Sequence, residues 1–413
     1  MKILVINPIL STSEGSQVHR VATIKDTMIH AMCLGFRHLG HEVTLAAVDD
    51  YRPTADQQYD FEVLWFRDTL RWLLPSPLPC PWGLRSYLKH HAQEFDMILT
   101  SEVFAFTSLF AARFAPEKTL IWQELSVHQR KWHRLPSRFW HNYVAPWAFK
   151  HVPVVVTRSQ RAHDFIKPYL KQTVDTVVDH GIDLSWLPVN SKKCKQFIAI
   201  GQLIERKGMD TIIDRFAQFC GLPQAEGYSL LIAGQGPRED ALRQQVARLG
   251  IDDRVKFLGH LSHAALGEYL AQSVASLVAT SHDLNMVSVT ESIAAGTPVI
   301  MNTVPNTADF VQQHALGIVR DKWDANDLLA VAHDQGFAQR CQAIRSTLSC
   351  EAAAQRLITI MKGGDSKSPP SPSVSYAAPW RGQRALLAKL KNSAPAPSKT
   401  QRAATRSPTG CNL

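Results

Sequence analysis

The feature that most constrains the fold of this chain is a regular alternation of strand-like and helix-like segments. Residues 2–9 are apolar enough for a buried strand. Apolar residues then recur at helical spacing from Val21 to Leu39, where Gly40 is expected to end the helix. The alternation continues along the chain to a strand-like run at 299–301. Because alternating strands and helices favour parallel sheets covered by helices, we predict an α/β protein with doubly wound sheets.

A break in this alternation divides the chain into two series. Pro188 and Asn190 interrupt the pattern within 185–195, and strand-like and helix-like segments resume after them. A length of 413 residues is sufficient for two domains of ordinary size. We therefore assign residues 1–187 to a first Rossmann-like domain and residues 188–362 to a second, with a hinge between them.

Residues 363–413 have the composition of a disordered, basic tail. They contain seven of the 23 prolines and eight of the 45 Lys and Arg residues, but only one of the 36 Asp and Glu residues. Without this tail the chain is close to neutral, so the net charge of +9 is no argument for nucleic-acid binding. Within the tail, residues 380–390 mix Trp and Leu with cations. This fits either a short amphipathic helix at a membrane surface or part of a solvated tail.

Cysteine usage and hydropathy indicate a cytoplasmic protein. The seven cysteines are odd in number and include no C-x2-C pair, which favours free thiols in a reducing compartment. The N-terminal segment MKILVINPIL is expected to form a buried strand rather than a signal peptide. No run of about 20 apolar residues is present, so we expect no membrane-spanning helix.

The segment 281–300, SHDLNMVSVTESIAAGTPVI, carries the strongest chemical signal. It places Asp283 before a helical stretch and Glu291 eight residues later, and the helix is expected to stop at Gly296. A helix that starts just after a strand offers unpaired N–H groups and the positive end of a dipole to a phosphate. Glu291 lies about two turns in, so it can reach a group attached to that phosphate, such as a ribose. The segment therefore indicates a sugar-nucleotide site.

This segment also resembles a known motif. Asp283, Glu291 and the following G-T-P-V-I at 296–300 are similar to the acid-x7-acid motif of retaining GT-B fold glycosyltransferases of family 4. The resemblance is dense in the second half of the chain and thin in the first. It implies a hexosyltransferase-type enzyme with two Rossmann-like domains facing each other across a cleft. It would move a sugar from a nucleotide donor to a saccharide or lipid-linked acceptor in exopolysaccharide or cell-surface glycan synthesis.

A loop at 201–208 supplies the predicted diphosphate contacts. The resemblance implies that Lys207 matches the family lysine that grips the diphosphate, whereas Gln202 stands where the family has an arginine. Arg206 could supply the missing cation. The alternative is a basic turn that faces solvent. The chain has no D-x-D motif and no His/Cys cluster with metal-ligand spacing, so we expect a metal-independent enzyme without a cofactor.

The remaining second-half contacts follow from the same resemblance. Backbone N–H groups of Asn285, Met286 and Val287 would hold the phosphates, and Asp283 would lie near the donor sugar. Glu291 would accept hydrogen bonds from the ribose hydroxyls. The alternative for Glu291 is a carboxylate on the helix surface, because acids are common near helix starts.

Three further positions complete the predicted site. In the resemblance, the backbone at Phe257 and Leu258 edges the nucleotide base, and Gly15 lies in a small-residue loop near the donor phosphates. Glu124 stands where the family often has a histidine beside the reacting sugar. The turn at 180–183 resembles a family turn that we expect to shape the hinge.

The acceptor and the rival functions stay open at this point. Residues 129–151 and 65–74 interleave Trp, Tyr and Phe with Arg and Lys, which suits either a lipid headgroup surface or tryptophans in the core with cations at its edge. The near-neutral body argues against single-stranded nucleic acid. Because Gln202, Asp283 and Glu124 depart from the family pattern, a non-catalytic subunit that stabilises a partner is one rival. A sugar-nucleotide epimerase is another.

Overall fold

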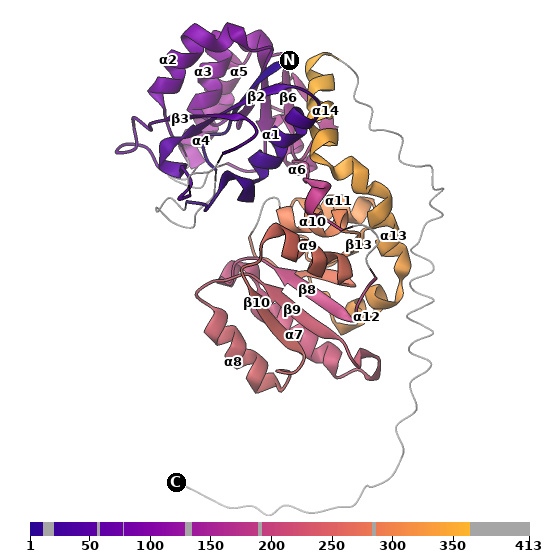
Figure 1. Ribbon diagram of the computed structural model, residues 1–413. Coiled ribbons are helices and arrows are strands. Elements are labelled where there is room, and N and C mark those ends of the chain that lie inside the picture. The colour runs from indigo at the N-terminus through magenta and orange to yellow at the C-terminus, as the bar shows by residue number, and fades with distance from the viewer. Residues whose placement is uncertain are drawn as a thin grey trace, which may run out of the picture. The chain divides into compact units, whose positions relative to one another are not determined.

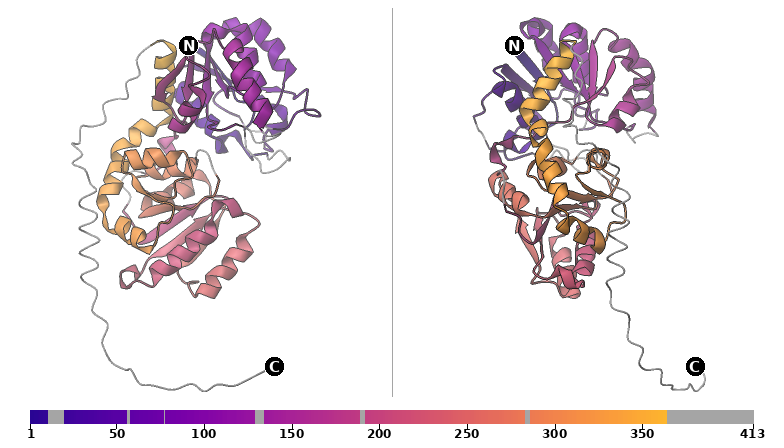
Figure 2. Two further views of the ribbon diagram at one scale, coloured as in Figure 1. Left: turned by 180° about the vertical axis from the view of Figure 1, so that it is seen from behind. Right: turned by 90° about the vertical axis from the view of Figure 1, so that its right-hand side faces the viewer.

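The computed structural model describes residues 1–10, 20–55, 58–76, 78–128, 134–188, 192–282 and 286–363. These residues form two separate parallel sheets, each flanked by helices on both faces (Figures 1 and 2). We call the first sheet with its helices the first lobe and the second sheet with its helices the second lobe. The α/β, doubly wound architecture predicted from the sequence is confirmed.

The first sheet has seven parallel strands in the order β3-β2-β1-β4-β5-β6-β7. Along β1, Ile3 and Val5 pack into one apolar cluster and Leu4 and Ile6 into another, so both faces of the strand are buried, as parallel sheets require. The strands are β1 (Lys2–Ile6), β2 (Glu42–Val48), β3 (Glu62–Phe66), β4 (Met97–Ser101), β5 (Thr119–Gln123), β6 (Val154–Thr157) and β7 (Thr173–Val177).

The helices of the first lobe are α1 (Met28–His38), α2 (Trp82–His91), α3 (Phe106–Phe114), α4 (Leu135–Phe139), a π-helical turn (Trp140–Val144), α5 (Ala145–Ala148) and α6 (Gln160–Ile166). Short 3-10 turns occur at Ile24–Asp26, Asp49–Tyr51, Ala92–Glu94, Pro116–Lys118 and Leu184–Trp186. The first helix starts later than its apolar spacing predicts. Residues 24–26 form a separate 3-10 turn, in which the Thr23 side chain accepts a hydrogen bond from the Lys25 backbone. Gly40 follows the helix with a φ of +80°, as expected of a helix end.

The second sheet has six parallel strands in the order β10-β9-β8-β11-β12-β13. The strands are β8 (Gln196–Ile200), β9 (Ser229–Ala233), β10 (Val255–Gly259), β11 (Ala275–Val278), β12 (Val299–Met301) and β13 (Gly317–Val319). The helices are α7 (Met209–Cys220), α8 (Glu239–Leu249), α9 (His263–Gln272), α10 (Val287–Ala294), α11 (Thr307–Gln313), α12 (Ala325–His333) and α13 (Gln335–Ile344). Short 3-10 turns occur at Glu205–Lys207, Pro223–Ala225 and Arg345–Leu348.

The last described helix, α14 (Cys350–Met361), packs on the first lobe. Leu357 and Ile358 belong to the same apolar cluster as Ile3 and Phe36. A Cβ added at Gly35 of α1 would lie 2.2 Å from the carbonyl oxygen of Cys350, so only glycine allows these two helices to approach so closely. The domain limits predicted from the sequence put these residues in the second domain, whereas their side chains complete the core of the first sheet.

Two further expectations concern a membrane-spanning helix and the C-terminal tail. No helix within the described ranges is both long and apolar enough to cross a membrane. Residues 364–413, including the segment 380–390, lie outside the described residues.

Candidate functional site

The loops that carry the predicted diphosphate contacts start at one point of the second sheet. The strand order reverses between β8 and β11, and ligands of such sheets bind beyond the carboxyl ends of the strands at this point. The loop 201–208 follows β8, and the segment 279–286 follows β11. The backbone oxygen of Arg206 accepts hydrogen bonds from Ser281 N (2.8 Å) and Thr280 Oγ1 (2.9 Å), so the two segments are joined directly.

Close backbone packing explains the glycines around this loop. A Cβ on Gly208, which has a φ of +63°, would lie 2.2 Å from the backbone oxygen of Ala279. A Cβ on Gly234 would lie 1.9 Å from the backbone oxygen of Gly201, and one on Gly236 would lie 2.5 Å from that of Leu203. The G-x-G turn after β9 therefore lets two loops pack backbone against backbone.

The two cations of the loop lie at the carboxyl end of β8. Nη1 of Arg206 donates a hydrogen bond to the backbone oxygen of His282 (3.2 Å), just before α10. The aliphatic part of Lys207 covers Gly201, since a Cβ there would lie 3.6 Å from Cδ of Lys207. Both side chains are partly buried, whereas Gln202 is exposed.

Helix α10 begins without a side-chain cap. Met286 is its N-cap residue, is buried, and makes no capping hydrogen bond through its side chain; Val287 is the first helical residue. The first turn of a helix has N–H groups without partners inside the helix, and those of residues 286 and 287 are the ones predicted to hold the phosphates. Asp283 and Asn285 lie outside the described residues, as does Gly15 of the first lobe.

Glu291 is a buried carboxyl group. Its exposed fraction is 9%, and burial raises its pKa to about 7, an effect that the nearby His180 partly offsets. No described residue donates a hydrogen bond to its carboxylate. The alternative that Glu291 is a carboxylate on the helix surface is therefore wrong.

Phe257 and Leu258 lie on the edge strand of the second sheet, where their side chains serve the core. The guanidinium of Arg243 lies 4.4 Å above the Phe257 ring, and Leu258 packs into an apolar cluster on the other face. The predicted contact of these two residues with a base is made by the backbone. The positions of their side chains do not test it, so it stays a prediction.

Four ionisable residues of the first lobe meet at the carboxyl ends of its strands. Arg158, after β6, is 4% exposed and donates hydrogen bonds to Glu124 Oε2 (2.5 Å) and Asp179 Oδ1 (3.0 Å). Its guanidinium lies 4.7 Å above the ring of Trp122. Nδ1 of His180 lies 2.9 Å from Arg158 Nη2 and 3.0 Å from Asp179 Oδ1. Burial would raise the pKa of Asp179, but its interactions with His180 and Arg158 hold that pKa far below its usual range.

Glu102 orients the turn that carries Glu124. Its carboxylate accepts hydrogen bonds from the backbone N–H groups of Glu124 (2.9 Å) and Leu125 (3.3 Å). Burial, together with the charge of Glu124, raises the pKa of Glu102 to about 8. Glu102 also has a φ of +70°, a strained conformation for a residue with a side chain, and such strain is found at functional sites.

Sequence reasoning identified Glu124 but not its partners. It expected the 180–183 turn to shape the hinge and gave no role to Glu102, Arg158 or Asp179. One signal could have found them: each follows a strand closely, and the carboxyl ends of parallel strands lie at one edge of a sheet. Because Glu124 is ion-paired with Arg158, its carboxylate is held in a fixed position.

Comparisons with known proteins show what this chain is similar to. Residues 188–333 match the family model described as glycosyl transferases group 1. The glycogen synthase of Mycobacterium tuberculosis is 26% identical over 263 residues, which cover 58% of this chain and 62% of that protein. The chain thus spans about three-fifths of the length of this relative.

Solved structures show the fold. HepE of Anabaena, solved in complex with UDP, superposes with a TM-score of 0.60 at 16% identity, covering 88% of this chain and all of that one. The sucrose-phosphate synthase of Thermosynechococcus elongatus superposes with a TM-score of 0.61 at 17% identity, covering 88% of this chain and 98% of that one. The chain has a GT-B fold. In this GT-B chain the family-model region coincides with the lobe that contains Lys207 and Glu291.

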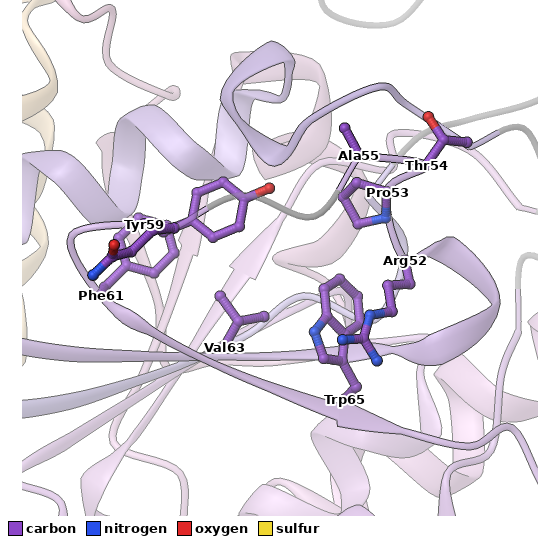
Figure 3. Close-up of a pocket in the computed structure, with 9 residues that line it drawn as sticks. Arg52, Pro53, Thr54, Ala55, Tyr59, Phe61, Val63 and Trp65 are labelled. Carbon is purple, nitrogen blue, oxygen red and sulfur yellow. The ribbon is translucent and has the colours of Figure 1, made fainter.

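Two other features of the GT-B chain lie apart from these residues. A pocket of about 440 Å³ borders the edge strand β3, where Tyr59 and Phe61 face Trp65 and Arg52 across Val63 (Figure 3). None of the predicted site residues lines it. Within the described ranges, the one group of three possible metal ligands is His38, Cys350 and Glu351, where His38 Nδ1 lies 2.7 Å from Glu351 Oε1.

Proposed function

We propose that this protein is a glycosyltransferase that moves a sugar, most simply a hexose, from a nucleotide-sugar donor to a saccharide or lipid-linked acceptor, with retention at the anomeric carbon. The observation that carries the proposal is the junction of the 201–208 loop with the entrance to α10 at the switch point of the second sheet. The reaction breaks the bond between the anomeric carbon and a phosphate oxygen, so negative charge grows on the diphosphate. This junction supplies the groups that stabilise such charge.

Each residue of the junction has a distinct part in the proposal. Lys207 and Arg206 provide two cations beside the diphosphate, and the uncapped first turn of α10 provides N–H donors at Met286 and Val287. Gln202 adds a neutral hydrogen-bonding group at the exposed edge of the same loop. Together they would stabilise the leaving group without a metal ion, and we propose metal-independent transfer.

Three acidic residues either position the donor or stabilise charge in this proposal. We assign the ribose hydroxyls to Glu291 and the donor sugar to Asp283, which lies outside the described residues. Glu124 accepts a hydrogen bond from Arg158, which fixes the position of its carboxyl group. We propose that Glu124 stabilises positive charge on the sugar ring. The division into two domains near residue 187 belongs to the same proposal, with α14 packed on the first lobe and closure over the donor at the hinge.

An exposed apolar stripe supports a lipid-linked acceptor at the inner face of the cytoplasmic membrane. The helical run from α4 to α5 leaves four large apolar side chains largely exposed, at every fourth position: Leu135, Phe139, Tyr143 and Trp147. Arg138 and Lys150 are exposed beside them. Such a stripe with flanking cations is typical of helices that lie at anionic lipid surfaces. Trp140, in contrast, faces inward and donates a hydrogen bond to the backbone oxygen of Val103 (2.9 Å).

A second candidate function is a non-catalytic subunit that binds a partner glycosyltransferase. The observation in its favour is the ion pair between Glu124 and Arg158, which occupies the carboxylate nearest the expected position of the reacting sugar. Such a protein would bind a nucleotide sugar without turning it over. An epimerase, in contrast, would convert the donor in the absence of any acceptor.

The proposed function is tested with a thermal-shift panel of UDP-, GDP- and ADP-sugars on the wild-type protein and on Glu291→Ala. We expect stabilisation of the wild type by one nucleotide class and loss of most of that shift in the variant. Product analysis of the stabilising donor, with and without saccharide acceptors, then separates transfer from epimerisation. No shift with any donor would refute nucleotide-sugar binding, and binding without turnover would favour the subunit.

A further inference from the structure

The side chain of His180 has one buried nitrogen atom without a hydrogen-bond partner in the described part of the chain. The residue is 3% exposed, and among the described residues its Nε2 has no hydrogen-bond partner. Buried polar atoms without partners are rare in folded proteins, because leaving one unpaired destabilises the folded state. The unpaired Nε2 atom therefore indicates a position at which a ligand could bind.

The other ring nitrogen of His180 is held firmly. Arg158 Nη2, which can only donate, lies 2.9 Å from Nδ1, and Asp179 Oδ1 lies 3.0 Å from it. When Arg158 donates to Nδ1, the ring proton is on Nε2. Glu291 interacts electrostatically with His180, and its negative charge favours the same tautomer, in which Nε2 is a hydrogen-bond donor.

Hydrogen bonds to one short segment, residues 345–350, fix the positions of the elements that carry His180 and Glu291. Ile182 and residues 348–350 exchange two hydrogen bonds, from Ile182 N to Leu348 O (2.8 Å) and from Cys350 N to Ile182 O (2.9 Å). Arg345, at the start of the segment, donates to the backbone oxygens of Leu187 and, at the end of α10, Ala294. The turn that carries His180 and the helix that carries Glu291 are thus tied to the same short stretch of chain.

The chemistry of the two groups selects their ligand. The Glu291 carboxylate accepts hydrogen bonds and repels phosphate, and the His180 Nε2–H donates. A hydroxyl group does both at once, because its oxygen accepts from Nε2 and its hydrogen is donated to the carboxylate. A pair of adjacent hydroxyls fits two such groups better than a phosphate or an apolar group would.

We propose that His180 is a nucleotide-binding residue whose Nε2 and the Glu291 carboxylate hold the same pair of ribose hydroxyls. The inference rests on the proposed function and extends it from the second lobe to the turn that precedes the hinge. In this proposal Arg158 and Asp179 fix the tautomer and the orientation of the His180 ring for its contact with the hydroxyls.

The test compares UDP with 2′,3′-dideoxy-UDP by calorimetry on the full chain, with GDP and ADP and their dideoxy forms measured in parallel. His180→Asn keeps an amide near the position of Nδ1 and removes Nε2, whereas His180→Gln keeps an amide near Nε2. We expect His180→Asn to bind the natural diphosphate about tenfold more weakly than the wild type and the dideoxy form equally well. His180→Gln should recover most of the affinity, and the exposed His90→Asn is the matched control and should change nothing.

The outcomes separate the two proposals. If the wild type binds no nucleoside diphosphate, the proposed function fails. If it binds and His180→Asn leaves the affinity unchanged, or weakens the natural and dideoxy forms equally, the shared hydroxyl contact is refuted. Should His180→Asn not fold, the ¹⁵N signal of His180 Nε2 in the wild type replaces it. That signal should shift with UDP and not with the dideoxy form, and an equal response to both would overturn the inference.

Discussion

Replacing Glu291 with glutamine should stabilise the protein at neutral and higher pH. Burial raises the pKa of Glu291 from 4.5 to about 7, and one pKa unit corresponds to about 1.36 kcal/mol, so ionising this group in the folded state costs about 3 kcal/mol. Because the folded pKa lies above the unfolded one, the contribution to stability is complete below about pH 4.5. It is lost progressively as the pH rises to about 7. Glutamine carries no charge, so Glu291→Gln avoids this loss.

Urea unfolding at pH 5 and pH 8 measures the effect. The free energy of unfolding of Glu291→Gln should exceed that of the wild type by about 2–3 kcal/mol at pH 8 and by less than about 1 kcal/mol at pH 5. Glu268→Gln, an exposed carboxylate on α9, is the matched control and should change neither value. An equal stability difference at the two pH values would refute the claim that Glu291 is a buried carboxyl group whose ionisation destabilises the fold.

Further outcomes follow from the other parts of the structure. Lys207→Met should weaken UDP binding roughly 10- to 100-fold in calorimetry, because a charge-assisted contact is lost. Arg158→Met should lower the free energy of unfolding by about 3–5 kcal/mol in urea, since it leaves Glu124 and Asp179 without their cation. Trp147→Ser should reduce co-sedimentation with anionic vesicles and leave thermal stability unchanged. Transfer rates should be the same with and without EDTA; a loss restored by added Mg²⁺ or Mn²⁺ would contradict metal-independent transfer.

The predicted fold and part of the predicted site depended on local information. Strands such as 2–6 and helices such as 28–38 follow from runs and spacings of apolar residues, which are properties of neighbouring positions. The diphosphate loop and the acid on α10 lie in short contiguous motifs, so Lys207 and Glu291 could be identified from the order of residues alone. The start of the first helix was misplaced because a 3-10 turn and a helix share similar apolar spacing.

The sequence by itself determined two doubly wound sheets and predicted a pair of loops that bind a diphosphate, because chain periodicity encodes the sheets and short motifs carry the prediction. Only the tertiary structure decided that Glu291 is buried, that α14 completes the core of the first sheet, and that Arg158 brings Glu124, Asp179 and His180 together. These facts depend on contacts between residues tens to hundreds of positions apart. Burial, and the pKa shifts and unpaired atoms that come with it, exists only once those contacts have formed.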